Sequence, residues 1–235
     1  MHSGIVKVNG RKEYHPYLSE DNQHDQVLVG VNLEKLINVA VEYDPAVILV
    51  ESDNGNDYKS AQHFNDVQKI CDRVNIPILR AYGTPEHCKH EVDHVGGIAK
   101  MVLCRAVASD VFFRDVSDMM EFLENEFEEK EQLKYVVREI AKEEVEEKRD
   151  KARHSNFLTV QGTTSFRVII FQPGQKSFRA SKRICICEKC CVEYGSCNQF
   201  EEYFFLKPHH EGQRMMNQFK LCQVMLLSFS PRYLS

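Results

Sequence analysis

Val47-Ile-Leu-Val-Glu-Ser-Asp53-Asn54-Gly55 is the clearest strand signal in the chain. Its apolar residues run without alternation, a pattern typical of a central strand that is buried on both faces. The run ends abruptly in an acidic, turn-forming cluster. Because open α/β sheets place ligands and catalytic groups at the carboxyl ends of their strands, the sequence predicts a functional group at Asp53.

The flanking segments alternate between helical and extended patterns. In chain order, they predict an irregular or hairpin-like start over 1–24, a helix over 27–43, a strand over 46–52, a helix over 58–74, a strand over 76–82 and a helix over 91–109. These lengths predict a parallel βαβ pair with a right-handed crossover. Gly96-Gly97 inside the last helix costs about 1 kcal/mol per residue relative to alanine, so we expect another group to approach closely there.

The second half of the chain changes in composition. Residues 121–151 are dominated by Glu and Lys, which indicates a solvated, amphipathic spacer helix or, alternatively, a coiled coil that binds a partner. A homo-oligomer through this helix is one such arrangement. Short strands are expected over 157–161, 166–171 and 177–186. We therefore predict four segments: an α/β domain over 1–120, the charged helix over 121–152, a small β-rich module over 153–206 and an irregular tail over 207–235.

Composition limits the classes of function. The chain has 235 residues, is 43% hydrophobic and carries a net charge of −5, which argues against a general nucleic-acid coat but not against a local basic groove. No run approaches the length of a membrane span, and no N-terminal stretch resembles a signal peptide, so we expect no membrane partner and a nuclear or cytoplasmic rather than secreted protein. Nine cysteines without an export signal favour metal binding over disulfides.

A second acidic cluster, Glu91-Val-Asp93, lies near a helix start. Mg²⁺ prefers hard oxygen ligands, and two-metal phosphoryl transfer needs at least three carboxylates that converge from different elements. Asp53 and either Asp93 or Glu91 are of the right kind. Since Glu91 and Asp93 are two residues apart, they do not share a helical face, and we expect at most one of them to be a ligand.

Three stretches carry a resemblance to a known family. They are 50–64 (Val-Glu-Ser-Asp-Asn-Gly-Asn-Asp-Tyr-Lys-Ser-Ala-Gln-His-Phe), 87–100 (His-Cys-Lys-His-Glu-Val-Asp-His-Val-Gly-Gly-Ile-Ala-Lys) and 178–197. Together they resemble a transposon-derived protein family related to DDE/D transposases and integrases with an RNase H-like fold. The resemblance covers roughly residues 14–206. It implies a DNA partner, two catalytic Mg²⁺ ions, Asp53 as the second catalytic acid and Asp93 as the third, with Glu91 the weaker candidate.

The sequence departs from that family in two places. Cys88 and His90 replace the two glycines of the usual His-Gly-Lys-Gly loop, and bulkier residues can block a close backbone approach to phosphate. An RNase H-like core also begins with three antiparallel strands, and the first catalytic Asp lies on the first of them. We find no place for these strands before the helix at 27–43. Asp21 and Asp25 belong to the start of that helix.

We therefore expect an N-terminally truncated, RNase H-like α/β domain that has lost the first catalytic acid and with it the activity. Basic side chains supply candidate nucleic-acid contacts: Lys59, His63, His87, Lys89, Lys100, Arg179, Lys182 and Arg183. The alternative is a non-catalytic module that binds nucleic acid or protein through the basic, Cys-rich end. A third hypothesis is that the chain has no function, because its truncated sheet exposes an unpaired edge and folds poorly.

The cysteine cluster is the last candidate site. Cys187-x-x-Cys190 has the spacing that lets two thiolates share one tetrahedral Zn²⁺, and Cys185 and Cys197 can complete a four-cysteine site. His209 or His210 can replace one of them. Because the cluster lacks a second CxxC pair, zinc, partly buried thiols and a disulfide all remain open.

Overall fold

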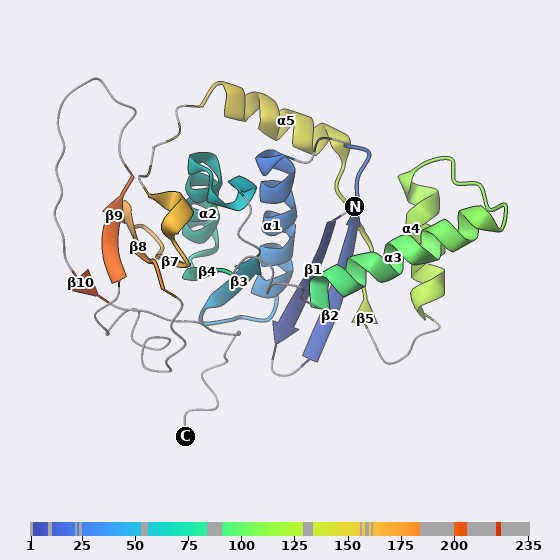
Figure 1. Cartoon of the computed structure of the whole chain (residues 1–235), viewed down its shortest axis with the longest axis horizontal. Coiled ribbons are helices and arrows are strands. Elements are labelled where there is room, and N and C mark those ends of the chain that lie inside the picture. Colours follow the sequence, from blue (N-terminus) through green and yellow to red (C-terminus); the bar gives the residue numbers. More distant parts are fainter. Residues whose placement is uncertain are drawn as a thin grey trace. The chain divides into compact units, whose positions relative to one another are not determined.

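The computed structural model describes residues 2–8, 11–21, 23, 25–52, 56–83, 91–128, 134–155, 157, 160, 162–183, 200–205 and 220–221. The described part contains five α-helices and two mixed sheets, which confirms the α/β class (Figure 1). The chain divides into two compact units, one of residues 1–42 and 89–151 and the other of residues 43–88 and 152–235. The units interleave along the sequence, unlike the consecutive segments that composition predicts.

The first unit is built on a β-hairpin. β1 (His2–Val8) and β2 (Arg11–Leu18) pair antiparallel, which confirms the hairpin-like start. Two short strands, β5 (Lys134–Tyr135) and β6 (Arg138–Glu139), pair parallel with β2. Two described strands therefore precede the first helix, where the sequence offered no place for the three strands of an RNase H-like core.

α1 (Gln26–Val41) packs against this sheet. The side chain of Asp25 caps the helix by accepting hydrogen bonds from the backbone N–H groups of Val27 and Leu28, which confirms its place at the helix start. Gly4 on β1 allows the close packing, because a Cβ at this position would lie 2.4 Å from the methyl carbons of Leu36. A larger residue at position 4 would therefore force the Leu36 side chain to move.

α3 (Glu91–Ala108) and α4 (Val116–Glu128) form a hydrophobic core in the first unit, together with residues of the sheet. Its buried members are Leu18, Ala99, Val102, Leu123, Phe127 and Val137. A Cβ at Gly96 would lie 2.7 Å from the hydroxyl oxygen of Ser3, so the expected close approach exists at this glycine. No described residue lies within 4 Å of a Cβ built at Gly97.

The prediction of one charged helix over 121–151 is wrong. α4 ends at Glu128, β5 and β6 follow, and only then does α5 (Lys142–Arg153) begin. Val137, Ile140 and Val145 are buried, so the segment belongs to the core of the first unit rather than to a solvated spacer. α5 is held to the start of α1 by Arg149, which pairs with Asp21 and Asp25 at 2.7 and 2.9 Å.

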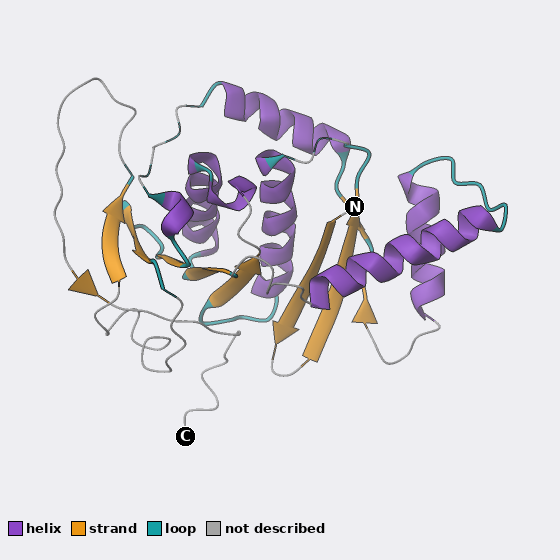
Figure 2. Cartoon of the chain, viewed as in Figure 1, coloured by secondary structure: helices purple, strands orange, loops and turns teal. Residues whose placement is uncertain are grey.

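The second unit contains a six-stranded sheet in the order β10-β9-β8-β7-β4-β3 (Figure 2). Its strands are β3 (Ile48–Ser52), β4 (Ile78–Tyr82), β7 (Val168–Phe171), β8 (Ser177–Ser181), β9 (Phe200–Phe204) and β10 (Lys220–Leu221). β3 and β4 pair in parallel, as predicted, and every other neighbouring pair is antiparallel. The predicted separate β-rich module is therefore not seen, because β7 and β8 extend the βαβ sheet beside β4.

α2 (Ala61–Val74) connects β3 to β4 and confirms the predicted helix. The Ser60 hydroxyl caps it by accepting from the N–H of His63, and Asn75 ends it in the left-handed conformation at φ 55°. Phe64 on its inner face contacts the rings of Phe166, Phe171 and Phe178. Phe157 and Val160, within the segment 157–161 predicted as a strand, have no regular secondary structure.

Candidate functional site

The carboxyl end of β3 is the predicted centre of the site. β3 ends at Ser52, so Asp53 comes directly after a strand end, but Asp53 itself lies outside the described residues. Asp93 is exposed in the first turn of α3, and the helix begins at Glu91. Asp53 belongs to the second unit, whereas Glu91 and Asp93 belong to the first. The convergence of these acids on Mg²⁺ stays a prediction.

The part of the chain that the structure describes contains no group of three or more His, Cys, Asp or Glu side chains that could hold a metal ion. The four cysteines Cys185, Cys187, Cys190 and Cys197 lie outside that part, as do His87 and Lys89. The zinc site therefore also stays a prediction. None of the described helices is long and apolar enough to span a bilayer.

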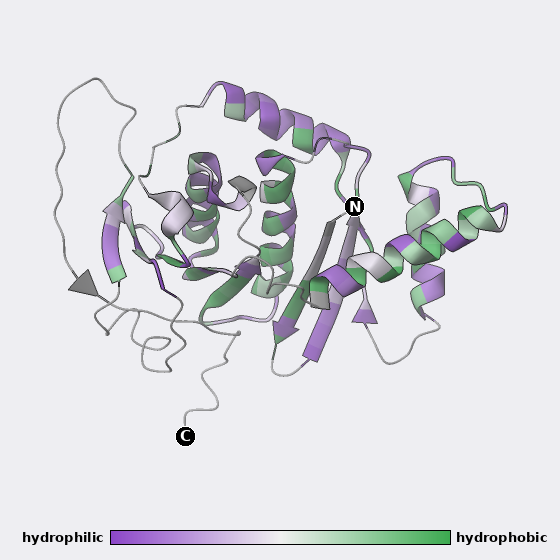
Figure 3. Cartoon of the chain, viewed as in Figure 1, coloured by the Kyte–Doolittle hydropathy of each residue, from purple (hydrophilic) through white to green (hydrophobic). Residues whose placement is uncertain are grey.

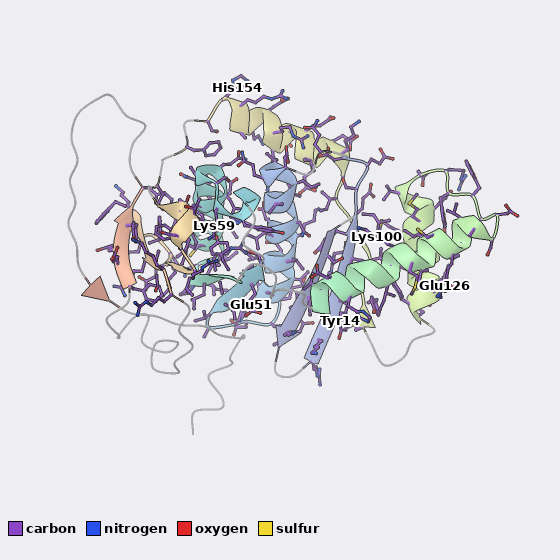
Figure 4. All side chains as sticks on the ribbon, viewed as in Figure 1. Tyr14, Glu51, Lys59, Lys100, Glu126 and His154 are labelled. Carbon is purple, nitrogen blue, oxygen red and sulfur yellow. The ribbon has the colours of Figure 1, made fainter. Side chains whose placement is uncertain are left out.

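Lys59 lies in the interior of the second unit, at the end of the 3-10 turn η1 (Asn56–Lys59), where Figure 4 labels it. It is 4% exposed, and its ammonium group donates to the carbonyl oxygens of Thr164 and Phe166 at 3.0 and 2.7 Å. Burial, followed by repulsion from Arg167, lowers the pKa of Lys59 to about 8. The ammonium thus ties η1 to the segment before β7 instead of facing solvent.

His63 is equally enclosed on the inner face of α2. It is 1% exposed, and neither of its ring nitrogens has a hydrogen-bond partner among the described residues. Burial, with a smaller contribution from the charge of Arg80, lowers its pKa well below the ordinary value, so the ring is neutral at pH 7. A neutral, buried imidazole does not attract phosphate, and the placement of His63 and Lys59 corrects the prediction that both contact DNA.

A cationic and aromatic cluster that was not predicted from the sequence surrounds these two residues. Arg80 on β4 is 1% exposed and donates to the Ser52 hydroxyl at 3.1 Å. Its guanidinium lies 5.2 Å from the ring centre of Tyr82 and 5.6 Å from that of Tyr58, within the range of cation–π attraction. The sequence does hold a signal for this cluster, because Arg80 interrupts an otherwise apolar strand and so indicates a buried charge.

A second buried polar row lies on β2, in the first unit. Glu13, His15 and Tyr17 alternate along the strand and therefore share one face of the sheet. Arg138 on β6 donates to Nδ1 of His15 at 3.4 Å, and Lys134 on β5 pairs with Glu13. Burial, followed by repulsion from Arg138, lowers the pKa of His15 to about 4, so this ring is also neutral at pH 7.

The remaining basic candidates lie near the surface. Lys100 is exposed on α3, and Lys182 and Arg183 are exposed immediately after β8. Arg179 is half-buried on β8, in register with Glu202 of β9. The structure thus keeps Lys182 and Arg183 together as an exposed basic pair in the second unit, and it places Lys100 in the first.

These features define an α/β protein with carboxylates after a strand end and at a helix start. The family model described as "Domain of unknown function (DUF8701)" matches residues 7–180, and the chain belongs to this family. No curated protein and no solved structure shows significant similarity to the chain.

Proposed function

We propose that the chain derives from a DDE/D transposase or integrase and that it binds DNA without cleaving it. The β3–α2–β4 unit is the observation that carries this proposal. Asp53 follows the carboxyl end of β3, where an α/β sheet presents functional groups. Asp93 lies exposed in the first turn of α3, the next helix along the chain. Both positions agree with the roles that the family resemblance implies for these acids.

The loss of catalysis is supported by the chemistry of the hairpin. A two-metal centre needs a third carboxylate, and in an RNase H-like core it comes from the initial antiparallel strands. β1 and β2 carry one acid, Glu13, which is 9% exposed and paired with Lys134. A carboxylate that is buried and paired with a lysine is a poor ligand for Mg²⁺, so β1 and β2 add no third ligand to Asp53 and Asp93.

DNA binding is supported by the exposed basic groups. Lys182 and Arg183 follow one another at the end of β8 and are both solvent-exposed, as is Lys100 on α3. Such groups bind phosphates through counterion release, which makes the affinity fall steeply with salt. Because the chain carries a net charge of −5, binding should depend on these local groups rather than on the overall charge.

Two assays on the full chain test the two halves of this proposal. A supercoiled-plasmid assay with Mg²⁺ should show no nicking; nicking that Asp53→Asn abolishes would overturn the loss of catalysis. Fluorescence anisotropy should show salt-dependent DNA binding that Lys182→Gln/Arg183→Gln weakens. The matched control, Lys69→Gln/Arg73→Gln, removes two exposed charges from α2. Equal binding by the two double variants, or no binding by the wild type, would overturn the DNA interface.

We also propose that Cys185, Cys187, Cys190 and Cys197 hold one structural Zn²⁺. The spacing Cys187-x-x-Cys190 supports this, because two thiolates at this separation share a tetrahedral ion. Metal analysis of the purified chain should give one zinc per molecule, reduced by Cys187→Ser/Cys190→Ser but not by Cys104→Ser. Zinc far below one equivalent in the wild type would favour thiols or a disulfide instead.

A further inference from the structure

Three basic side chains gather near the carboxyl ends of β3 and β4 in the second unit. Arg80 and Tyr82 alternate along β4 and therefore lie on the same face of the sheet. Arg167, just before β7, lies beside Tyr82, whose backbone N–H donates to its carbonyl oxygen at 2.8 Å. The ammonium group of Lys59 lies 4.8 Å from the ring centre of Tyr82. We call Lys59, Arg80 and Arg167 the cation cluster.

No carboxylate pairs with the cation cluster within the described residues. Lys59 donates to two backbone carbonyl oxygens, and Arg80 donates to the Ser52 hydroxyl. The side chain of Arg167 donates to the carbonyl oxygen of Gly83 at 3.3 Å. Arginine stays charged in proteins, and the burial of a charge without a counter-ion is strongly unfavourable. The described residues therefore leave an excess of positive charge in the interior of the second unit.

The acids of neighbouring elements do not supply the counter-ion. Glu51 lies on the opposite face of β3 from Ser52, because successive side chains of a strand alternate. The acids of α2 and β9 accept hydrogen bonds from other groups: Asp66, Asp72, Glu201 and Glu202. β3 changes from hydrophobic to hydrophilic toward its end, near the cation cluster (Figure 3). The cluster thus combines burial with a single sign of charge.

Polar groups beside the cation cluster have no described partner. Nε of Arg80 is buried without a hydrogen-bond acceptor among the described residues, and both ring nitrogens of His63 are equally unpaired there. In the side chain of Arg167, only Nη1 donates to a described acceptor. Since buried polar groups in folded proteins are nearly always paired, these donors indicate an acceptor that the described residues do not supply.

The backbone adds positive potential at the same place. α2 begins two residues after Lys59, and His63 lies in its first turn. The N-terminus of a helix carries a partial positive charge that favours an anion nearby. The helix end therefore acts in the same direction as the cation cluster.

We propose that the cation cluster binds a phosphate group, either free or carried by a small molecule. A phosphate monoester carries about −1.5 to −2 charges at pH 7 and presents three oxygens, so it balances several cations better than a carboxylate does. The guanidinium groups of Arg80 and Arg167 match pairs of these oxygens, and Lys59 adds a point charge. Arg167 is half-buried, so we expect phosphate to enter beside it.

Isothermal titration calorimetry of the full chain tests this site. Inorganic phosphate should bind at one equivalent and saturate, whereas acetate at the same ionic strength should give no saturable heat. A wild type that shows no saturable binding of phosphate would overturn the proposal, as would equal binding of phosphate and acetate. A carboxylate of the chain that already neutralised the cluster would give the first of these negative results.

Substitutions test whether the cation cluster is the site. Arg167→Gln should weaken the binding of inorganic phosphate roughly 10- to 100-fold, the loss expected for one charge-assisted hydrogen bond. Because Arg167 is half-buried, the far-UV circular dichroism spectrum should stay that of the wild type. Arg73→Gln removes an exposed arginine from α2 and is the matched control. Equal phosphate affinity of the two variants would overturn the assignment.

A second titration identifies the source of the phosphate. Tighter binding of adenosine 5′-monophosphate than of inorganic phosphate, with no binding of adenosine, would support a phosphate carried by a larger molecule. Equal binding of the two phosphates would support free phosphate. Adenosine that binds as tightly as its monophosphate would overturn the proposal. The DNA assays vary Lys182 and Arg183 instead, so the two proposals can fail separately.

Discussion

The ammonium group of Lys59 donates a 2.7 Å hydrogen bond to the carbonyl oxygen of Phe166, a residue 107 positions further along the chain. The same group donates to Thr164 and lies 4.8 Å from the ring centre of Tyr82. Lys59 therefore joins two segments of the second unit that are remote in sequence. Its role in the described structure is to satisfy buried carbonyls, which otherwise would have lost their contact with water.

Lys59→Met should destabilise the chain by about 1–3 kcal/mol, because the buried carbonyl oxygen of Phe166 and the partly buried one of Thr164 lose their donor. Chemical denaturation measures this change. Lys69→Met on the exposed side of α2 is the control and should change the free energy of unfolding by less than about 0.5 kcal/mol. If the two variants unfold alike, the carbonyl contacts of Lys59 contribute nothing to stability.

The difference in unfolding free energy between the wild type and Lys59→Met should depend on pH in the alkaline range. Burial lowers the pKa of Lys59 from 10.5 to about 8 in the folded chain. Between these values the unfolded chain holds a proton that the folded chain has released, so this group makes the free energy of unfolding rise with pH. The difference between wild type and Lys59→Met should therefore grow from pH 8 to pH 10, and a difference that shrinks over this interval contradicts the assignment.

Asp25 and Arg149 offer a test of how α5 is attached. One carboxylate oxygen of Asp25 caps α1, and the other accepts from Arg149 at 2.9 Å. Asp25→Asn keeps the cap but removes the ion pair, so a double-mutant cycle with Arg149→Met isolates the pair. We expect a coupling of about 1 kcal/mol at pH 7, since the pair is partly buried. Zero coupling would show that Asp25 stabilises the chain through its helix cap and not through its ion pair with Arg149.

The coupling between Asp25 and Arg149 should also depend on acid pH. Burial by itself would raise the pKa of Asp25, but the hydrogen bonds from Arg149, Leu28 and Val27 outweigh it and leave that pKa below the ordinary value. The stabilisation is therefore present above the usual pKa of aspartate and is lost as the pH falls through the lower, folded-state pKa. The cycle repeated at decreasing pH should show the coupling disappear.

The sequence predicted the β3–α2–β4 unit because its signals are local. The continuous apolar run of β3 acts within a few residues, and the strand lies where it was expected. The helix predicted over 58–74 is α2, which begins at Ala61 after the Ser60 cap and ends at Val74 before the left-handed Asn75. The position of β7 beside β4 is different, because it depends on pairing between residues about ninety positions apart. Such pairing leaves no local pattern, so the segment after 152 was interpreted as a separate module.

Composition misled the interpretation in two places. The Glu/Lys content of 121–151 suggested one helix, although β5 and β6 are only two residues each and are fixed by β2 rather than by their own sequence. Lys59 and His63 were taken as surface residues because they are basic. His63 shares the helical spacing of Phe64, Val67 and Cys71, so the period placed it on the buried face even though its residue type did not.

Gly4 should not tolerate a side chain. A methyl group there would lie 2.4 Å from the Leu36 side chain, so Gly4→Ala should destabilise the first unit by about 1–3 kcal/mol through overpacking. Leu36→Ala provides space, and the cost of Gly4→Ala should be smaller in that background. Leu36→Ala alone is the control, because it shortens the same neighbouring side chain without adding a methyl group at position 4. Thermal and chemical unfolding of the wild type, the two single variants and the double variant measures these differences.

The buried histidines should make the chain sensitive to mild acid. Burial lowers the pKa of His15 from 6.5 to about 4, and it lowers that of His63 as well. As the pH falls from 6.5 to 4, these imidazoles become protonated in the unfolded chain but stay neutral in the folded chain. The free energy of unfolding therefore decreases by at most about 1.4 kcal/mol per pH unit for each group. His15→Gln and His63→Gln should each reduce this slope. His154→Gln, which removes an exposed histidine from the turn after α5, is the control and should leave the slope in place. A wild-type chain whose unfolding free energy is constant between pH 6.5 and 4 would show that these rings gain protons as readily in the folded state as in the unfolded one.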